Sequence, residues 1–275
     1  MHTTCVSDAF IRRIAAIGLQ TNSSIPKSGG KMKIYRIGRL TAVAMLSVTW
    51  TASYASGQTL WLAPESDGEM KVHCYFSGFE DRANFVDKVS ITQVWRTNER
   101  ERCEPVFLRN GGNSFWVCDQ DEGLASTYWL SHDFGISEMD GVPERVFLHA
   151  KTHTSADPST WRYVTKPKHF AIEIIPRREK FNHRFTVLSV GRPLAEAKVN
   201  MLGPDSFKQT GDTDENGEVT FELPQSGMYG LRVRSVHSQK GLVDGRSFVQ
   251  TVHVSTLSLP LEVIPDMKLI TLTTK

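Results

Sequence analysis

From Thr59 onward, the apolar residues of this chain occur mostly in short runs that alternate with polar residues and end at Gly, Pro, Asn or Asp. A period of two is the pattern of strands with one buried face, and turn residues at close intervals predict that these strands are short. After the N-terminal region, no segment keeps a helical period over about 12 residues, a usual helix length. The sequence therefore predicts an all-β protein with two β-sandwich domains of immunoglobulin-like or transthyretin-like type. The clearest predicted strands are 70–76, 91–96, 126–131, 146–153, 170–175 and 184–189.

The N-terminal region carries a second pattern, that of a signal peptide. Three basic residues between positions 33 and 39 precede an apolar run at 40–50, and Ala52-Ser-Tyr-Ala55 follows it. A positive segment, an apolar segment and a small-x-small site are the three parts of a secretory signal. The apolar run is shorter than the roughly 20 residues that a spanning helix needs. We therefore expect residues 32–55 to be cleaved after Ala55, giving a periplasmic or extracellular protein that is not an integral membrane protein once processed.

Residues 1–31 lie upstream of this complete signal, so we expect an untranslated or disordered extension, with translation starting at Met32. The charge balance changes with processing. Residues 56–275 hold 25 basic and 29 acidic residues, a net charge of −4. No excess of positive charge remains to attract a phosphate backbone, and nucleic acid is excluded as an expected partner.

Three cysteines remain after processing: Cys74, Cys103 and Cys118. An oxidising compartment favours one disulfide and one odd thiol. Asn110-Gly111 is a strong hairpin signal, and a two-residue turn there would make Cys103 face Cys118. We expect that disulfide, although the same register gives Pro105 a hydrogen-bonded position that it cannot fill, which favours a bulge or longer loop. Pairing of Cys74 with either of the others stays open.

A domain boundary is predicted near 176–180, where a strand ends at Pro176 and a charged run begins. All five tryptophans of the mature chain precede this point and none follows it, which indicates that the two halves have different core chemistry. We therefore expect an N-terminal domain over 56–176 and a C-terminal domain over 177–275.

The C-terminal half resembles the carboxypeptidase-regulatory or CnaB-type β-sandwich module. Three of its patterns, "G-x-P-L-x-x-A-x-V", "T-D-x-x-G-x-V-x-F" and "G-x-Y-x-L-x-V", match residues 191–199, 213–221 and 227–233. The resemblance covers about half of this domain. It implies a sandwich architecture and no particular activity.

A wider resemblance covers most of the mature chain. The segments 60–64, 144–151 and 171–176, with the sandwich module, resemble a bacterial cell-envelope family once labelled NikM-like nickel-transport proteins. Several members open with "H-x-F-W-L-x-P", whereas here Gly57-Gln-Thr-Leu60 precedes Trp61 and supplies no His. The resemblance implies an envelope location and a link to metal or nutrient uptake, but this departure weakens a metal site at the mature N-terminus.

Histidines are the candidate metal ligands, since imidazole suits nickel, copper and zinc. If the protein binds such an ion, we expect the ligands to come from several strands of the N-terminal half, with His73, His149 and His153 the best candidates. The last two lie on one face of a predicted strand but roughly 13 Å apart, so one strand alone does not make a site. The run Asp212-x-Asp214-x-Asn216-Gly217 resembles half of a calcium loop, but Leu223 stands where the bidentate Glu belongs, and a turn explains it better.

No catalytic motif occurs in the chain. Gly-x-Ser-x-Gly, His-Glu-x-x-His, a phosphate-binding glycine loop and Cys-x-x-Cys are all missing. Ser131-His132-Asp133 has the residue types of a triad, but neighbours on one strand cannot form it. We therefore expect a non-enzymatic binding or accessory protein with an unidentified ligand or envelope protein partner. The alternatives are a structural or adhesive envelope protein, and a hydrolase whose site assembles from distant residues.

Overall fold

The structure is a computed structural model, which describes residues 59–65, 71–77, 93–98, 100, 102–110, 116–119, 124–165, 170–179 and 182–263. The predicted signal peptide and the extension before it lie outside these residues. Most of the described chain is β-strand, with one short 3-10 helix, η2 (Pro158–Thr165). All six clearest predicted strands are confirmed, most with ends that differ by up to four residues, whereas the strand predicted over 126–131 continues to Met139. No helix among the described residues is both long and apolar enough to cross a membrane.

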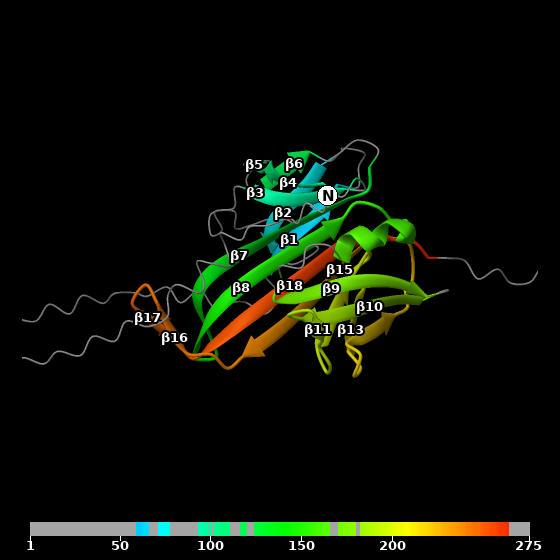
Figure 1. The fold of residues 1–275 in the computed structure, drawn as a ribbon. Coiled ribbons are helices and arrows are strands. Elements are labelled where there is room, and N and C mark those ends of the chain that lie inside the picture. The colour runs from blue at the N-terminus through cyan, green and yellow to red at the C-terminus, as the bar shows by residue number, and fades with distance from the viewer. Residues whose placement is uncertain are drawn as a thin grey trace, which may run out of the picture. The chain divides into compact units, whose positions relative to one another are not determined.

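The largest sheet has eight strands in the order β13-β12-β15-β18-β8-β7-β3-β4. Its long central members are β7 (Ser126–Met139), β8 (Val142–His153), β18 (Gln250–Leu261) and β15 (Gly227–His237), which run side by side in Figure 1. The outer members are β13 (Lys208–Asp212), β12 (Lys198–Leu202), β3 (Gln93–Asn98) and β4 (Cys103–Phe107). Neighbours pair antiparallel except β18 and β8, which pair in parallel. We call this the central sheet.

A smaller sheet covers one face of the central sheet. It contains β1 (Thr59–Pro64), β2 (Lys71–Ser77), β6 (Trp116–Asp119) and β5 (Arg109–Asn110), in that order. Side chains at even positions of the central strands, such as Leu148 and Val252, pack against residues of this sheet to form a first hydrophobic core. The Thr256 hydroxyl donates to the carbonyl of Leu60 at 2.8 Å, which joins β18 to β1 on this face.

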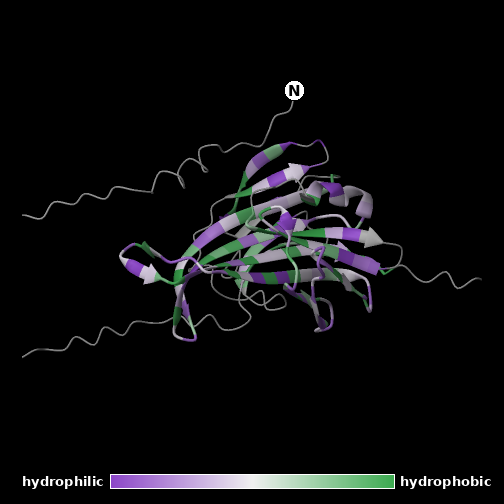
Figure 2. Ribbon diagram, turned by 60° about the horizontal axis from the view of Figure 1, so that its bottom comes forward, coloured by the Kyte–Doolittle hydropathy of each residue, from purple (hydrophilic) through white to green (hydrophobic). Residues whose placement is uncertain are grey.

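A third sheet covers part of the opposite face. It contains β11 (Arg192–Pro193), β10 (Asn182–Ser189), β14 (Glu218–Phe221) and β9 (Ile172–Glu179). Odd-numbered residues of β15 and β18, such as Leu231 and Leu257, pack against this sheet and η2 in a second core. Because side chains alternate between faces along a strand, β18 contributes to both cores. The protein is thus all-β, with two β-sandwiches that share the central sheet, and Figure 2 shows hydrophobic and hydrophilic residues interspersed along its strands.

The predicted boundary between residues 176 and 177 falls inside β9. The central sheet takes β3, β4, β7 and β8 from before this point and β12, β13, β15 and β18 from after it. The second core also begins earlier in the chain, at Trp161 in η2. The described residues, which lie between 59 and 263, belong to one compact unit. The two stretches expected as separate domains therefore share one sheet.

The Asp-rich segment is a turn, as the sequence indicated, and it carries the chain from β13 in the central sheet to β14 in the third sheet. The Asp214 carboxylate accepts the backbone N–H groups of Asn216 and Glu218, at 2.9 and 2.8 Å. Gly217 takes a φ of 71°, which a residue with a side chain adopts at a cost. A short hairpin of β16 (Gly241–Val243) and β17 (Arg246–Phe248) completes the described strands.

Candidate functional site

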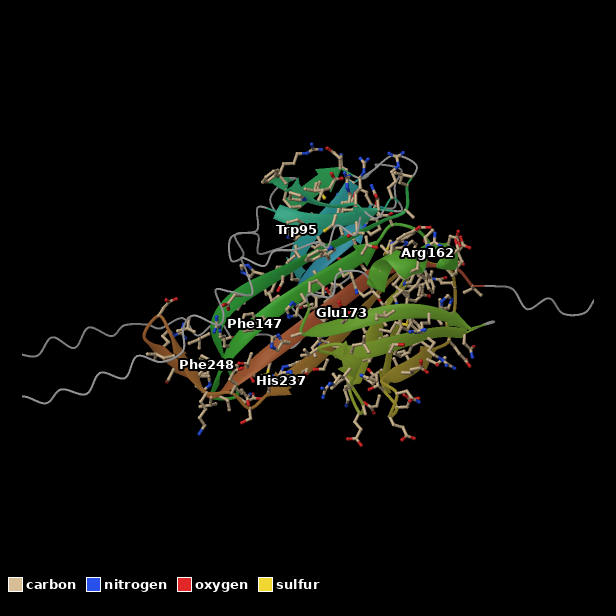
Figure 3. All side chains as sticks on the ribbon, in the orientation of Figure 1. Trp95, Phe147, Arg162, Glu173, His237 and Phe248 are labelled. Atoms are coloured by element: carbon tan, nitrogen blue, oxygen red, sulfur yellow. The ribbon has the colours of Figure 1, made fainter. Side chains whose placement is uncertain are left out.

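Three histidines from three neighbouring strands lie in a row on one face of the central sheet. They are His149 on β8, His253 on β18 and His237 on β15, and we call them the histidine row. They lie on the face of the second core but beyond its apolar part, since β18 passes from buried Leu257 to half-buried His253. His149 is 4% exposed, and His237 is half-buried. Figure 3 labels His237 on β15 and Phe147, whose ring stacks on that of His253 at 5.1 Å. The row is therefore anchored on its buried side and open at its other end.

The closest contact in the row joins His149 Nε2 to His253 Nδ1 at 3.1 Å. The ring planes differ by 9°, and the ring centroids are 5.4 Å apart. In an imidazole ring, each nitrogen lies about 1.2 Å from the ring centroid. The 3.1 Å between the two nitrogens plus this distance for each ring is close to the centroid separation of 5.4 Å. The two centroids and the two nitrogens therefore lie almost on a straight line. The contact is a hydrogen bond between imidazoles in which one proton is shared.

Ser131 extends the row on β7, directly opposite His149 in the register. Its Oγ lies 2.9 Å from His149 Nδ1, so both nitrogens of this imidazole have a partner. The hydrogen bonds that join Ser131, His149 and His253 allow two arrangements of the protons, because the Ser131 hydroxyl either donates to His149 or accepts from it. At the other end, Ser235 Oγ lies 3.3 Å from His237 Nε2. The His237 ring meets that of His253 edge to face at 5.4 Å.

Burial keeps two imidazoles of the row, those of His149 and His253, neutral. Loss of hydration, and then the charge on His253, lowers the pKa of His149 to about 3. Loss of hydration, and then the charge on His237, lowers the pKa of His253 to about 4. Both groups therefore carry no charge at neutral pH. A neutral imidazole has one free lone pair, the form in which histidine binds a metal.

Next to the row, Lys151 and His153 hold neighbouring elements together through hydrogen bonds. Lys151 is 1% exposed and donates from Nζ to the Val164 carbonyl at 3.0 Å. Burial lowers its pKa to about 8, and the charge of Glu173, labelled in Figure 3, opposes this shift. His153 is fully buried, with Nδ1 2.9 Å from Thr127 Oγ1 and Nε2 2.8 Å from Thr160 Oγ1. These contacts tie η2 to the sheet.

The structure does not bring His73, His149 and His153 together. His73 lies on β2 in the smaller sheet, where its Nε2 is 2.8 Å from a Glu65 carboxylate oxygen. Both nitrogens of His153 are occupied by threonines. Of the three, His149 has another imidazole within contact distance, and that imidazole is His253. Within the described part of the chain, no three His, Cys, Asp or Glu side chains are grouped closely enough to hold a metal ion.

Cys103 and Cys118, the expected disulfide partners, lie in different sheets of the structure and are not bonded to each other. Cys103 lies on β4 opposite Thr97 of β3, on the face of the central sheet that points away from the first core. Cys118 lies on β6 in the smaller sheet and is buried inside that core. The register differs because Asn110 pairs with Trp116, so the connection is longer than a two-residue turn. Residues 111–115 lie outside the described part of the chain.

Ser131 and His149 have the residue types of a nucleophile and its base, which tests the hydrolase alternative. A general base works best when its pKa lies near the working pH, but that of His149 is about 3. The second histidine is neutral as well, so it cannot stabilise an imidazolium as the aspartate of a serine triad does. Asp133 is instead engaged by Arg145 at 2.6 Å. This arrangement is poorly suited to activating a hydroxyl.

The sequence pointed to His149 but not to its partner. His253 alternates with Val252 and Val254, which both belong to the first core, so the period of two could have placed it on the opposite face. Nothing in the sequence indicated that β18 pairs with β8, and the two histidines are 104 residues apart. Three tryptophans of the N-terminal half, Trp61, Trp129 and Trp161, are buried.

No family model and no curated protein matches this chain. Among solved structures, it is similar to a two-domain fibronectin type-III segment from chicken tenascin, with 9% sequence identity and a TM-score of 0.19. The match covers 72% of this chain and 97% of the tenascin segment. A likeness this weak does not bear on function, and the all-β fold is established by the strands themselves.

Proposed function

We propose that this protein is a non-enzymatic binding module of the cell envelope, which takes up a transition-metal ion at the histidine row. The observation that carries the proposal is the straight contact between His149 Nε2 and His253 Nδ1 at 3.1 Å. Both imidazoles are neutral at pH 7, so an ion competes with one shared proton and not with two positive charges.

Ser131 would orient the buried ligand. When His149 donates from Nδ1 to Ser131 Oγ, its Nε2 lone pair points toward His253. A metal-bound imidazole usually donates its other N–H in this way, which fixes its tautomer and ring orientation. Ser131 itself is exposed, so solvent reaches this end of the row.

Among nickel, copper and zinc, reduced copper fits this pair best. Zinc prefers four tetrahedral ligands and nickel a square-planar or octahedral set, and the histidine row offers two opposed nitrogens. Cu(I) accepts two ligands in a straight line. With metal–nitrogen bonds of about 2 Å, the nitrogens must separate from 3.1 Å to about 4 Å. His253 is half-buried and can make this movement, and His237 is the nearest additional donor.

Export through a signal peptide cleaved after Ala55 is part of the proposal. It is supported by the sequence pattern of residues 32–55. The intact mass of the exported protein measures it, since the mature chain then begins at Ser56.

A structural or adhesive role is the second candidate, and two exposed apolar side chains favour it. Phe107 on the edge strand β4 is 72% exposed, and Leu242 on the β16–β17 hairpin is 69% exposed. A β-sandwich suits such a role as well as ligand binding. Under this candidate, the histidine row has no ligand, so metal titration separates the two.

The experiment is a metal titration of residues 56–275, produced without a histidine tag. Cu(I) affinity is measured anaerobically by competition with a chromogenic chelator, and nickel and zinc by calorimetry. A Cys103→Ser background removes the half-buried thiol as a competing ligand. We expect one Cu(I) per chain, and a loss of at least tenfold in affinity in His149→Asn and in His253→Asn.

His132→Asn is the matched control, because His132 lies on β7 beside Ser131 but points to the opposite face of the sheet. It should bind as the parent does. Binding weaker than about 10 μM for all three ions, which corresponds to roughly −7 kcal/mol, would reject the metal proposal. Equal losses of Cu(I) affinity in His132→Asn and His149→Asn would show that the ion does not bind at the histidine row.

A further inference from the structure

Two of the three cysteines lie together in the first core. In the pairing of β2 with β6, Val72 is opposite Cys118 and Cys74 is opposite Trp116. Cys74 and Cys118 are therefore diagonal neighbours on adjacent antiparallel strands. Positions 72 and 74 share a face of β2, so both thiols point to the same side. Cys74 is 1% exposed and Cys118 is 2% exposed.

We infer that Cys74 and Cys118 form a disulfide in the mature protein and that Cys103 is the odd thiol. Diagonal positions on antiparallel strands have Cα atoms about 7–8 Å apart, and their Cβ atoms are closer. A disulfide usually joins Cα atoms less than about 7 Å apart, so forming it needs a movement of roughly 1 Å. Strand β6 can make this movement, since it has four residues and pairs on its far side with the two residues of β5.

The alternative partner is blocked by the sheet itself. Cys103 pairs with Thr97 and points away from the first core, so β3 and β4 separate it from the other two sulfurs. A bond from Cys103 to Cys74 or Cys118 would require its strand to turn over. That change would also remove Val106 from the first core, against which it packs.

The bond must form before the core closes. Burial, and then the charge on Cys118, raises the pKa of Cys74, and burial is the main cause that raises the pKa of Cys118 to about 12. In the folded protein these thiols do not ionise and do not react as nucleophiles. During folding, one thiolate attacks the disulfide of a donor, such as an envelope oxidoreductase or glutathione disulfide, and forms a mixed disulfide. The second cysteine then displaces the donor. The two cysteines lose two electrons and two protons, and the donor leaves as two thiols.

Peptide mapping tests the assignment directly, because trypsin puts each cysteine in a separate peptide. Cleavage after Lys71, Arg82, Arg102, Arg109 and Arg145 releases peptides 72–82, 103–109 and 110–145. Residues 56–275 are refolded in a glutathione redox buffer, alkylated without reductant and digested. We expect peptides 72–82 and 110–145 to be joined and peptide 103–109 to be alkylated. A linked peptide 103–109, or alkylation of all three, would overturn the inference.

A stability measurement gives a second test that does not depend on digestion. We expect a reductant added during unfolding to lower the melting temperature of the parent and of Cys103→Ala by at least several degrees. The same reductant should leave Cys74→Ala and Cys118→Ala unchanged. Equal responses in all four proteins would contradict the bond. Because the core shields the sulfurs, the folded parent should also resist reduction without denaturant.

Discussion

At the scale of single residues, the protein keeps several imidazoles where they are difficult to protonate. His149 and His153 are buried, with pKa values near 3 and 4, and His253 is half-buried with a pKa near 4. Each has hydrogen-bond partners that a neutral ring can satisfy. Because the folded protein resists protonation at these histidines, its free energy of unfolding should depend on pH.

We predict that the protein loses stability as the pH falls from about 6.5 toward 4. In this range the unfolded chain binds protons at these histidines, whose ordinary pKa is about 6.5, but the folded chain does not. Protonation therefore favours the unfolded state, by up to about 1.4 kcal/mol per pH unit for a fully buried group and less for half-buried His253. Urea titrations at pH 7, 6, 5 and 4.5 measure the effect.

His149→Asn provides the comparison for this prediction. Asparagine keeps a polar contact to Ser131 but does not titrate, so the variant should lose less stability between pH 7 and pH 5 than the parent. Carboxylates that titrate at lower pH affect both proteins equally. Parallel pH profiles for the two would show that His149 does not carry the dependence.

At the scale of secondary structure elements, the turn between β13 and β14 shows how one residue fixes a connection between sheets. A Cβ added to Gly217 would lie 2.5 Å from the Val187 carbonyl oxygen, and the φ of this residue is positive. Gly245 also has a positive φ, of 76°, but nothing lies within 4 Å of its added Cβ. Comparing substitutions at Gly217 and Gly245 therefore separates the cost of a positive φ from the cost of a steric clash.

We predict that Gly217→Ala destabilises the protein by about 2 kcal/mol or more, and Gly245→Ala by about 1 kcal/mol. The first substitution adds a clash with the backbone of β10 to the cost of the positive φ, whereas the second has the positive φ alone. Urea unfolding measures both. Equal losses would mean that the contact with Val187 relaxes at no cost.

The positions of the strands were more predictable from the sequence than the way in which the strands pair. The period of two located β2, β3, β7, β8, β9 and β10, because each has one face against a core. The cysteine register was not predictable, because it depends on the longer connection between Asn110 and Trp116. The partner of His149 was equally out of reach, since strand pairing over 104 residues leaves no local signal.

At the scale of the whole molecule, the two sandwiches depend on each other through the central sheet. The second core receives Trp161 and Val164 from η2 and Ile172 and Ile174 from β9. All four precede the predicted domain boundary. Burying such side chains contributes roughly 1.5–3 kcal/mol each, and their sum is comparable to the net stability of a domain.

We predict that residues 156–275 retain a cooperative unfolding transition and residues 181–275 do not. The shorter fragment lacks η2 and β9 and so exposes one side of the second core. Circular dichroism during heating measures both fragments. A cooperative transition in the shorter fragment, at the temperature of the longer one, would show that the C-terminal sandwich closes without these elements.

The parallel pairing of β8 with β18 also determines when the sheet can be completed. β18 is the last strand that the structure describes, yet it lies in the interior of the central sheet, between β8 and β15. Until it is in place, both neighbours have an open edge with unpaired backbone groups, the kind of surface on which chains aggregate. Contacts between distant segments form slowly, so this incomplete state is long-lived compared with hairpin formation. A chain that crosses a membrane from its N-terminus delivers β18 after all of its partners. Completion of the sheet is therefore limited by the arrival of the C-terminal region, and if the protein is exported as proposed above, the open edges of β8 and β15 stay unpaired until β18 follows.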